Sequence, residues 1–387
     1  IQDFKSIRFM RMFMRGFNQD VILRLAKLDL VRAEWRKYNI SFLEGGERVS
    51  VPEPEDGSFE ISSVSIEENA GKEPVNYVLP PGFDRVIDPS NPQLRQLNEQ
   101  SMVMRVLGLE DGDARAAFKN VNLDIRQYRK LRMEVHGEEI IGEPLLDDEL
   151  TVFIRIGSDY KGNFYEYELP LKLTDPGYYN KDNEEDRALV WPEANSFNID
   201  LSLFQEAKKA RNAELDRPGS YLSRSDIYVY PHEDARISVS GNPNLSNVRV
   251  IMIGIRNPIK TRNTSTDDGM PKSGEIWVNE LRLSDFNEDG GWAANARMQT
   301  RLANLGTVDL VGQTSTPGFG SLDMKVNERS KEQVAKYDVS SNLDLGKFFP
   351  EEAGVRLPVY VGYSESRIQP EYNPLDPDIP FKDALKD

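Results

Sequence analysis

The chain has 387 residues, a formal net charge of −16, two His and no Cys. Without cysteine, no disulfide or thiolate–metal site can form, and the acidic excess would repel a phosphate backbone, which argues against a nucleic-acid binder. The apolar runs are far shorter than the ~20 residues that a membrane helix needs, whereas membrane β-strands stay possible because their sequence signal is weak.

Residues 1–40 begin with a two-residue alternation, continue through the turn GFNQD at 16–20, and end in an apolar run from Val21 to Trp35. This pattern favours a hairpin, although the apolar run also fits one side of a helix. A similar pattern returns at 248–257 and 275–286, which suggests a faint internal repeat. We therefore expect residues 1–40 to be the terminal hairpin of a preceding β-sandwich or barrel strands, and the chain to be a piece of a longer protein.

Residues 41–94 are rich in Pro, Gly, Ser and acidic residues, which predicts a linker or an extended strap. Short alternating segments separated by turn residues follow in 95–286, and they predict an antiparallel β-sandwich of the jelly-roll type. A polar, Ala-rich segment, Leu203–Asp216, predicts a surface helix that ends before Pro218, and the acidic cluster 182–186 predicts a solvated loop. The expected strands are 101–107, 115–119, 130–136, 150–156, 164–173, 197–203, 226–230, 236–240, 248–256 and 275–283.

Residues 287–387 show longer amphipathic alternation, which predicts hairpins that belong to a large outer-membrane β-barrel together with their loops. A soluble sandwich with one solvated face is the alternative, because amphipathic strands occur in both. Strands are expected near 292–302, 307–314, 337–345 and 355–363. In the first of these, the candidates for the lipid-facing side are Trp292, Ala294, Ala296, Met298 and Leu302, and those for the pore-facing side are Asn295, Arg297, Gln299 and Arg301.

No motif points to catalysis, so we expect a protein that is not an enzyme. His136 and His232 are not part of a zinc-binding pattern, and ordinary structural or surface roles are favoured for both. Glu110, Asp111 and Asp113 surround Gly112 and could offer oxygens to Ca²⁺, but the run is not an EF-hand loop and a solvated turn is favoured. No other cofactor is expected.

Several stretches resemble the SprA/Sov family, the outer-membrane translocons of type IX secretion and gliding motility in Bacteroidetes. They include LEDGDARAAFKN at 109–120, GEIWVNELRLSDF at 274–286, QTSTPGFG at 313–320 and KFFPE at 347–351. The resemblance implies a giant β-barrel in the outer membrane with extramembrane domains, which exports folded cargo proteins carrying a C-terminal signal. It implies as partners a shuttle barrel protein at a lateral gate, a periplasmic plug protein and outer-membrane lipid, with no nucleic acid.

The leading hypothesis is therefore a structural part of a protein-translocation channel. The alternative is a secreted carbohydrate-binding β-sandwich module of a polysaccharide-degrading enzyme, for which the aromatic run Tyr160–Tyr167 would supply a sugar platform, although its alternation also fits the core and edge of one strand. A third possibility is calcium-stabilised adhesion through Glu110, Asp111 and Asp113.

Overall fold

The structure is a computed structural model of the chain. It describes residues 35–38, 58–85, 99–232, 235–261, 268–288, 290–321, 323–324 and 328–385. Of the hairpin predicted in residues 1–40, only residues 35–38 are described, and the rest of it, with nearly all of the first copy of the faint repeat, lies outside the described residues. None of the described helices is both long and apolar enough to cross a membrane.

The larger sheet of the fold has seven antiparallel strands in the order β1-β4-β11-β6-β7-β10-β9. Its central strands are rich in β-branched and aromatic residues, which fit a pleated surface that is covered on both faces. The strands are β1 (Arg36–Tyr38), β4 (Ala114–Leu123), β6 (Thr151–Gly157), β7 (Phe164–Pro170), β9 (Tyr228–Tyr230), β10 (Arg236–Ser240) and β11 (Val248–Arg256).

A second sheet of five antiparallel strands, in the order β2-β3-β12-β5-β8, packs against the first. Eight strands form two sets, β3-β12-β5-β8 and β4-β11-β6-β7, which is the strand order of a jelly roll. The core between the sheets includes Ile154, Tyr165 and Ile253 from one side and Met133 and Ile276 from the other. The predicted antiparallel sandwich is thus confirmed. The strands of this sheet are β2 (Phe59–Ser65), β3 (Gln100–Leu109), β5 (Tyr128–Glu138), β8 (Phe197–Asp200) and β12 (Lys272–Phe286).

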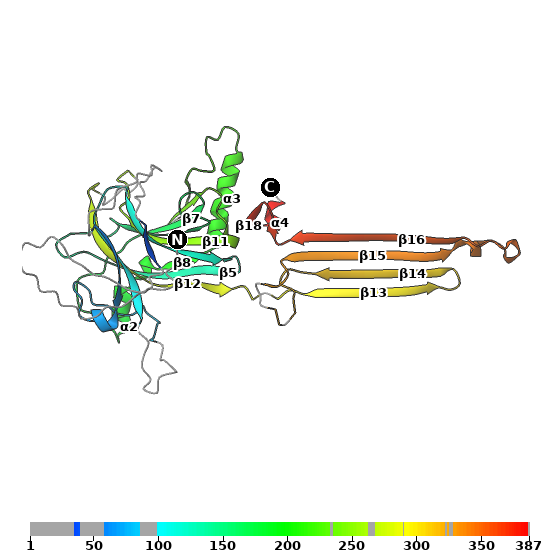
Figure 1. Cartoon of the computed structure of the whole chain (residues 1–387), viewed down its shortest axis with the longest axis horizontal. Coiled ribbons are helices and arrows are strands. Elements are labelled where there is room, and N and C mark those ends of the chain that lie inside the picture. Colours follow the sequence, from blue (N-terminus) through cyan, green and yellow to red (C-terminus); the bar gives the residue numbers. More distant parts are fainter. Residues whose placement is uncertain are drawn as a thin grey trace, which may run out of the picture. The chain divides into compact units, whose positions relative to one another are not determined.

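The strands after β12 form a separate four-stranded antiparallel sheet in the order β13-β14-β15-β16, with β13 and β16 at its edges (Figure 1). A two-stranded hairpin and a short helix follow it. Short 3₁₀ turns, η4 (Leu345–Phe348) and η5 (Glu351–Ala353), connect β15 to β16. The elements are β13 (Ala293–Leu302), β14 (Gly306–Ser315), β15 (Glu332–Asp344), β16 (Pro358–Pro370), β17 (Tyr372–Asn373), β18 (Asp376–Pro380) and α4 (Phe381–Ala384).

The structure differs from the sequence predictions in the segment 41–94. Phe59–Ser65 is strand β2, which pairs with β3 along its whole length, and Val75–Leu79 is buried without being part of a strand. Pairing with β3 makes this segment a strand, although its apolar residues Phe59, Ile61 and Val64 do not alternate strictly and the surrounding prolines favour a linker. The described part of this segment is therefore part of the sandwich.

The helices show a second difference. α3 (Ser202–Asp216) lies where a helix was predicted, but it is not simply a surface helix, because Phe204, Ala207, Lys208 and Arg211 are buried. Their spacing of i, i+3, i+4 and i+7 places all four on one face. The acidic cluster 182–186 is also not a plain loop: α2 (Glu184–Val190) begins there, capped by the Asn183 side chain. A single turn, α1 (Ile66–Asn69), and two 3₁₀ turns, η1 (Glu193–Asn195) and η2 (Leu245–Asn247), complete the described helices.

Candidate functional site

The four-stranded sheet sorts its side chains by polarity across all four strands. Residues directly opposite each other in an antiparallel sheet place their side chains on the same face. The register pairs Met298 with Leu310, Leu310 with Val339, and Val339 with Tyr363, so an apolar row crosses the sheet. The apolar face holds Ala294, Ala296, Met298, Thr300, Leu302, Gly306, Val308, Leu310, Gly312, Thr314, Ala335, Tyr337, Val339, Ser341, Leu343, Val359, Val361 and Tyr363, and at one end it also carries the charged Glu365 and Arg367. The central rows of the other face hold Asn295, Arg297, Gln299, Arg301, Thr307, Asp309, Val311, Gln313, Lys336, Asp338, Ser340, Asn342, Tyr360, Gly362, Ser364 and Ser366.

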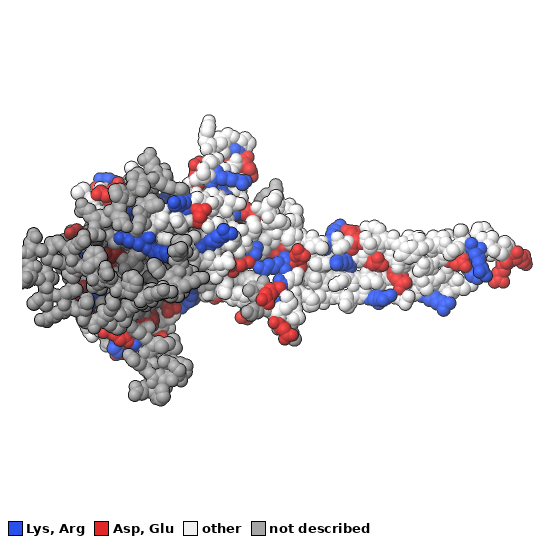
Figure 2. Space-filling view, in the orientation of Figure 1, with Lys and Arg blue, Asp and Glu red and all other residues white. Residues whose placement is uncertain are grey.

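The residues singled out in the sequence follow this division. Ala294, Ala296, Met298 and Leu302 share the apolar face of β13, and Trp292 lies immediately before that strand in the same alternation. Asn295, Arg297, Gln299 and Arg301 share the opposite face. Side chains on both faces are exposed, and Met298 keeps 56 % of its surface accessible. On the side seen in Figure 2, uncharged residues cover most of β13–β16, with charged residues scattered among them. The lipid and pore contacts assigned to these residues stay predictions.

The dimensions of the apolar face suit a lipid layer. Ala294 to Leu302 is nine residues long, within the ~9–11 residues of a tilted β-strand that crosses a membrane. The apolar band of a membrane barrel is ~25 Å tall and is flanked by aromatic residues. Beyond the end of the face where β15 leads into β16, Phe348 and Phe349 are exposed. The length and the aromatic residues therefore agree with a strand segment that crosses a bilayer.

An aromatic and charged cluster lies toward the other end of the apolar face. The rings of Tyr337 and Tyr363 have centroids 6.0 Å apart. Both hydroxyls donate to Glu365 Oε2, Tyr363 at 2.9 Å, and Arg367 Nε donates to Glu365 Oε1 at 2.9 Å. Tyrosines and charges of this kind are typical of the level at which lipid headgroups meet water.

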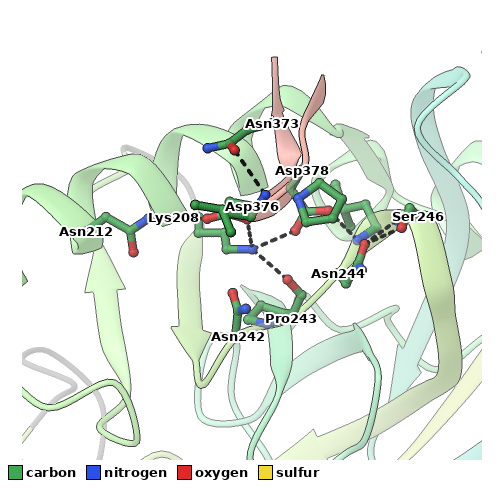
Figure 3. Close-up of polar contacts among 12 residues, drawn as sticks. Lys208, Asn212, Asn242, Pro243, Asn244, Ser246, Asn373, Asp376 and Asp378 are labelled. Atoms are coloured by element: carbon green, nitrogen blue, oxygen red, sulfur yellow. Dashed lines mark hydrogen bonds and ion pairs between the residues drawn. The ribbon is translucent and has the colours of Figure 1, made fainter. Parts of the chain in front are cut away.

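A buried polar cluster ties the segment after β16 to the jelly roll (Figure 3). Lys208 of α3 and Asp378 of β18 both have fully buried side chains, and Lys208 Nζ donates to Asp378 Oδ2 at 3.0 Å. Lys208 also donates to the carbonyl of Pro243 at 2.7 Å and lies 2.5 Å from Asp376 Oδ1. A buried ammonium with this set of acceptors is satisfied in both charge and hydrogen bonding. We call Lys208, Asp376 and Asp378 the hairpin lock.

The jelly-roll core completes the hairpin lock. The Tyr165 hydroxyl donates to Asp378 Oδ2 at 2.6 Å, and the Leu245 N–H donates to Asp378 Oδ1 at 2.5 Å. Burial raises the pKa of the Asp378 carboxyl above its usual value, although Lys208 and the hydrogen bonds act in the opposite direction. Burial and the neighbouring Asp378 also raise the pKa of the Tyr165 hydroxyl, which therefore stays protonated and able to donate.

Further contacts join the jelly roll to the same end of the four-stranded sheet. Lys331, just before β15, donates to Asp124 Oδ2 at 3.0 Å, and Arg126 donates to the same oxygen at 2.7 Å. The Arg126 guanidinium also lies 4.4 Å from the ring centroid of Tyr372 and donates to the Pro377 carbonyl at 3.2 Å. These contacts hold the start of β15 and the hairpin after β16 against the loop between β4 and β5.

A comparison with known families bears on what this arrangement does. The family model SprA_N, described as a motility related/secretion protein, matches residues 1–385. The chain belongs to the SprA_N family. The resemblance read from the sequence is thus confirmed, and with it a family role in motility or secretion. No curated protein matched the chain.

The acidic residues considered for calcium in this SprA_N chain are engaged otherwise. Asp113 Oδ1 accepts from the Ala114 N–H at 2.8 Å, and its Oδ2 accepts from Arg115 at 2.5 Å. Asp111 Oδ1 accepts from the Lys260 N–H at 3.0 Å, while Glu110 is exposed. Within the part of the chain that the structure describes, no group of three or more His, Asp or Glu side chains is arranged to hold a metal ion.

In the aromatic run considered as a sugar platform, Phe164, Tyr165 and Tyr167 are core, whereas Tyr160 is partly buried. Tyr165 and Tyr167 point between the two sheets and Phe164 is buried on the other face of β7, so none can stack on a glycan. His136 is buried as well, with Nδ1 2.7 Å from the Val190 carbonyl oxygen and its ring against Trp277 at 3.9 Å between centroids. These positions remove the observation that favoured a carbohydrate-binding module.

Sequence reasoning missed the hairpin lock in the SprA_N chain. Lys208 and Asp378 are 170 residues apart, so no local pattern links them. One signal was present: Lys208 shares a helical stripe with the apolar residues Phe204 and Ala207, which places a cation on the buried face of α3. A buried cation requires an acidic partner, but the sequence does not identify which one.

Proposed function

We propose that the chain is a structural part of an outer-membrane protein-translocation channel that exports folded cargo in type IX secretion and gliding motility. In this proposal, β13–β16 form a segment of the pore wall, and the jelly roll is an extramembrane module fastened to one end of that segment. The observation that carries the proposal is the sorting of side chains in one continuous register over four strands.

The physical argument starts from the two faces of the sheet. An exposed apolar face is costly in water but is stabilised against hydrocarbon, where burial contributes ~25 cal/mol per Å². The polar face, with Arg297 3.9 Å from Asp309, suits a water-filled lumen. A wall of this kind performs no chemistry, so the proposal assigns no catalytic residue and no cofactor. Its task is to hold an aqueous path open through the lipid.

The partners follow from the resemblance to the family. Secreted cargo with a C-terminal signal would pass along the lumen, where the row Asn295, Arg297, Gln299 and Arg301 offers exposed polar side chains. A shuttle barrel protein and a periplasmic plug protein would contact the channel elsewhere. Outer-membrane lipid would cover the opposite face, with Arg367 at its headgroup end.

Paired substitutions on the two faces of β13 test the proposal. Ala296→Arg and Met298→Arg should destabilise membrane assembly by about 2–4 kcal/mol near the bilayer midplane. The matched controls Asn295→Arg and Gln299→Arg introduce the same side chain on the polar face, one residue away, and should assemble normally. The measurement is the yield of folded protein in outer-membrane fractions of cells that make the native protein.

Labelling gives an independent measurement. Since these 387 residues contain no cysteine, a cysteine introduced singly at 295 to 299 can be labelled with a membrane-impermeant thiol reagent and recognised by its labelled peptide. Positions 295, 297 and 299 should react and positions 296 and 298 should not. Uniform reactivity along β13, or equal assembly of all four Arg variants, would show that the sheet is solvated on both faces and would refute the pore-wall assignment.

A further inference from the structure

A pocket lies at the end of the four-stranded sheet where β13 turns into β14 and β15 leads into β16. Its volume is about 350 Å³, and both connections at this end, 303–305 and 345–357, belong to the described residues. Amides, one carboxylate and one aromatic ring line it together with aliphatic side chains, and no cation is among the described lining residues. These residues are Asn304, Leu305, Gly306, Asn342, Leu343, Asp344, Pro358, Val359 and Tyr360.

Backbone contacts fix the shape of this pocket. The Asp344 N–H donates to the Leu305 carbonyl at 2.7 Å, which ties the turn between β13 and β14 to the end of β15. Asp344 Oδ1 accepts from two backbone N–H groups of the connection between β15 and β16, at 3.1 and 3.2 Å. A Cβ at Gly306 would lie 2.0 Å from the Asn342 carbonyl oxygen, so only glycine lets β14 begin this close to β15. The walls are therefore in place before a ligand arrives, which lowers the entropy cost of binding.

Tyr360 supplies an aromatic platform beside the pocket. A Cβ at Gly362 would lie 2.9 Å from the Tyr360 hydroxyl oxygen and 3.2 Å from its ring carbon Cε1, so the ring extends along β16 over Gly362. Glycine at this position leaves the space that the ring occupies. Tyr360 nevertheless keeps 69 % of its surface exposed. A ring that lies against a strand and is open to solvent presents a flat surface on which the apolar face of a ligand can stack.

Two amide side chains without partners lie close to this platform. Asn342 is directly opposite Tyr360 in the register of β15 and β16, and Asn304 belongs to the turn between β13 and β14. Both side chains are exposed. Among the described residues, no side chain or backbone group forms a hydrogen bond with the side chains of Asn304, Asn342 or Tyr360. Since each amide can both donate and accept, the two can bind a ligand without first breaking an existing contact.

We propose that this pocket binds a neutral oligosaccharide, with one sugar ring stacked on Tyr360 and its hydroxyls bound by Asn304 and Asn342. One face of a pyranose ring carries C–H groups that suit an aromatic surface, and its hydroxyls both donate and accept, as the amides do. An anionic ligand is disfavoured, because the lining holds the Asp344 carboxylate and no cation. The volume lies within the ~300–1,000 Å³ of small-molecule pockets. The site needs only that the polar face of β15 and β16 meets water, so it does not depend on lipid at the opposite face.

Photolabelling of the native protein, solubilised in a detergent without a sugar headgroup, tests this site. The probes are maltotriose, cellotriose and chitotriose, each with a diazirine at the reducing end, and the readout is mass spectrometry of the labelled peptides. We expect at least one probe to label peptides that contain residues 303–306, 342–344 or 358–362. An excess of lipopolysaccharide from the producing cells then distinguishes two sources of the ligand. Loss of labelling would identify a lipid-linked glycan, and unchanged labelling would identify a soluble one.

Four variants decide whether the label reports the pocket. Tyr360→Ala and Asn342→Ala should each lower labelling several-fold, whereas Tyr360→Phe keeps the stacking surface and should keep most of the labelling. Ser364→Ala is the matched control, because Ser364 is exposed on the same face of β16 but does not line the pocket. If Tyr360→Ala lowers the yield of folded protein, Asn342→Ala against Ser364→Ala carries the test.

Three results would overturn the proposal: no label on these peptides from any of the probes, labelling that neither Tyr360→Ala nor Asn342→Ala lowers, or equal labelling by a triethylene glycol that carries the same diazirine. The outcome is separate from that of the pore-wall assignment. Equal assembly of the Arg variants of β13 would refute the pore wall and leave the labelling of this pocket unchanged.

Discussion

Replacing Lys208 by Met should destabilise the jelly roll strongly. Lys208 and Asp378 have no solvent-exposed side-chain surface, so Lys208→Met leaves the carboxylates of Asp378 and Asp376 without their cation. Removal of one partner from a buried ion pair costs about 3–5 kcal/mol. Asp378→Asn should lower the free energy of unfolding by less, about 1–3 kcal/mol. This substitution removes a charge that burial already disfavours, and the side chain then accepts one hydrogen bond fewer.

Urea unfolding followed by tryptophan fluorescence measures these differences, since Trp191 and Trp277 are buried in the jelly roll. Lys209→Met is the matched control. Lys209 pairs with Asp383 at 2.6 Å, but about a third of each side chain is exposed, so the loss should be only about 0–1 kcal/mol. The double variant Lys208→Met/Asp378→Asn should be less unstable than the sum of the single changes. Equal effects of Lys208→Met and Lys209→Met, or strict additivity in the double variant, would refute the assignment of the hairpin lock.

Three further predictions concern the jelly roll. Although burial raises the pKa of the Glu166 carboxyl, Arg155 and Arg256 lower it from 4.5 to about 2, so its stabilising contribution is complete above pH 4.5 and is lost as the pH falls towards 2. Glu166→Gln should therefore lower the free energy of unfolding by about 3–5 kcal/mol at pH 7 and by progressively less in acid. Urea titrations at several pH values can check this. Gly254→Ala should destabilise by about 1–3 kcal/mol, because the added Cβ would lie 2.3 Å from Phe153 Cζ; an unchanged urea midpoint would contradict this. Chelation by EDTA should leave the melting temperature unchanged, since the Asp113 carboxylate already binds Arg115; a decrease that calcium restores would show a metal site.

Local sequence patterns predicted most of the strands, and for some strands they also predicted the first and last residues. Arg236–Ser240 and Val248–Arg256 have the predicted ends, because the apolar alternation stops at the Gly–Asn–Pro turn between them and at Asn257–Pro258. The division of β13 into two faces was also readable, since alternation alone determines which side chains share a face. Neighbouring strands then continue those faces through their register.

Long-range contacts could not be predicted in this way. β2 is a strand because it pairs with β3 along its whole length, and nothing within Phe59–Ser65 outweighs the prolines around it. The hairpin lock depends on a helix and a hairpin that lie far apart in the chain. In each case the deciding partner is distant in sequence, and a single sequence carries no signal for the pairing.

The register of β13–β16 determines which codon deletions this sheet should tolerate. All three strand pairings run without a bulge, from Ala293 opposite Ser315 to Asp344 opposite Pro358. Because side chains alternate with a period of two, deletion of one codon within β14 would exchange its two faces from that point onward, whereas deletion of two codons would preserve them. Length variation in this sheet should therefore be tolerated in even steps within strands, and in any step within the connection between Leu345 and Leu357. A library of in-frame deletions would show directly whether deletions of an even number of codons are tolerated within these strands and deletions of an odd number are not.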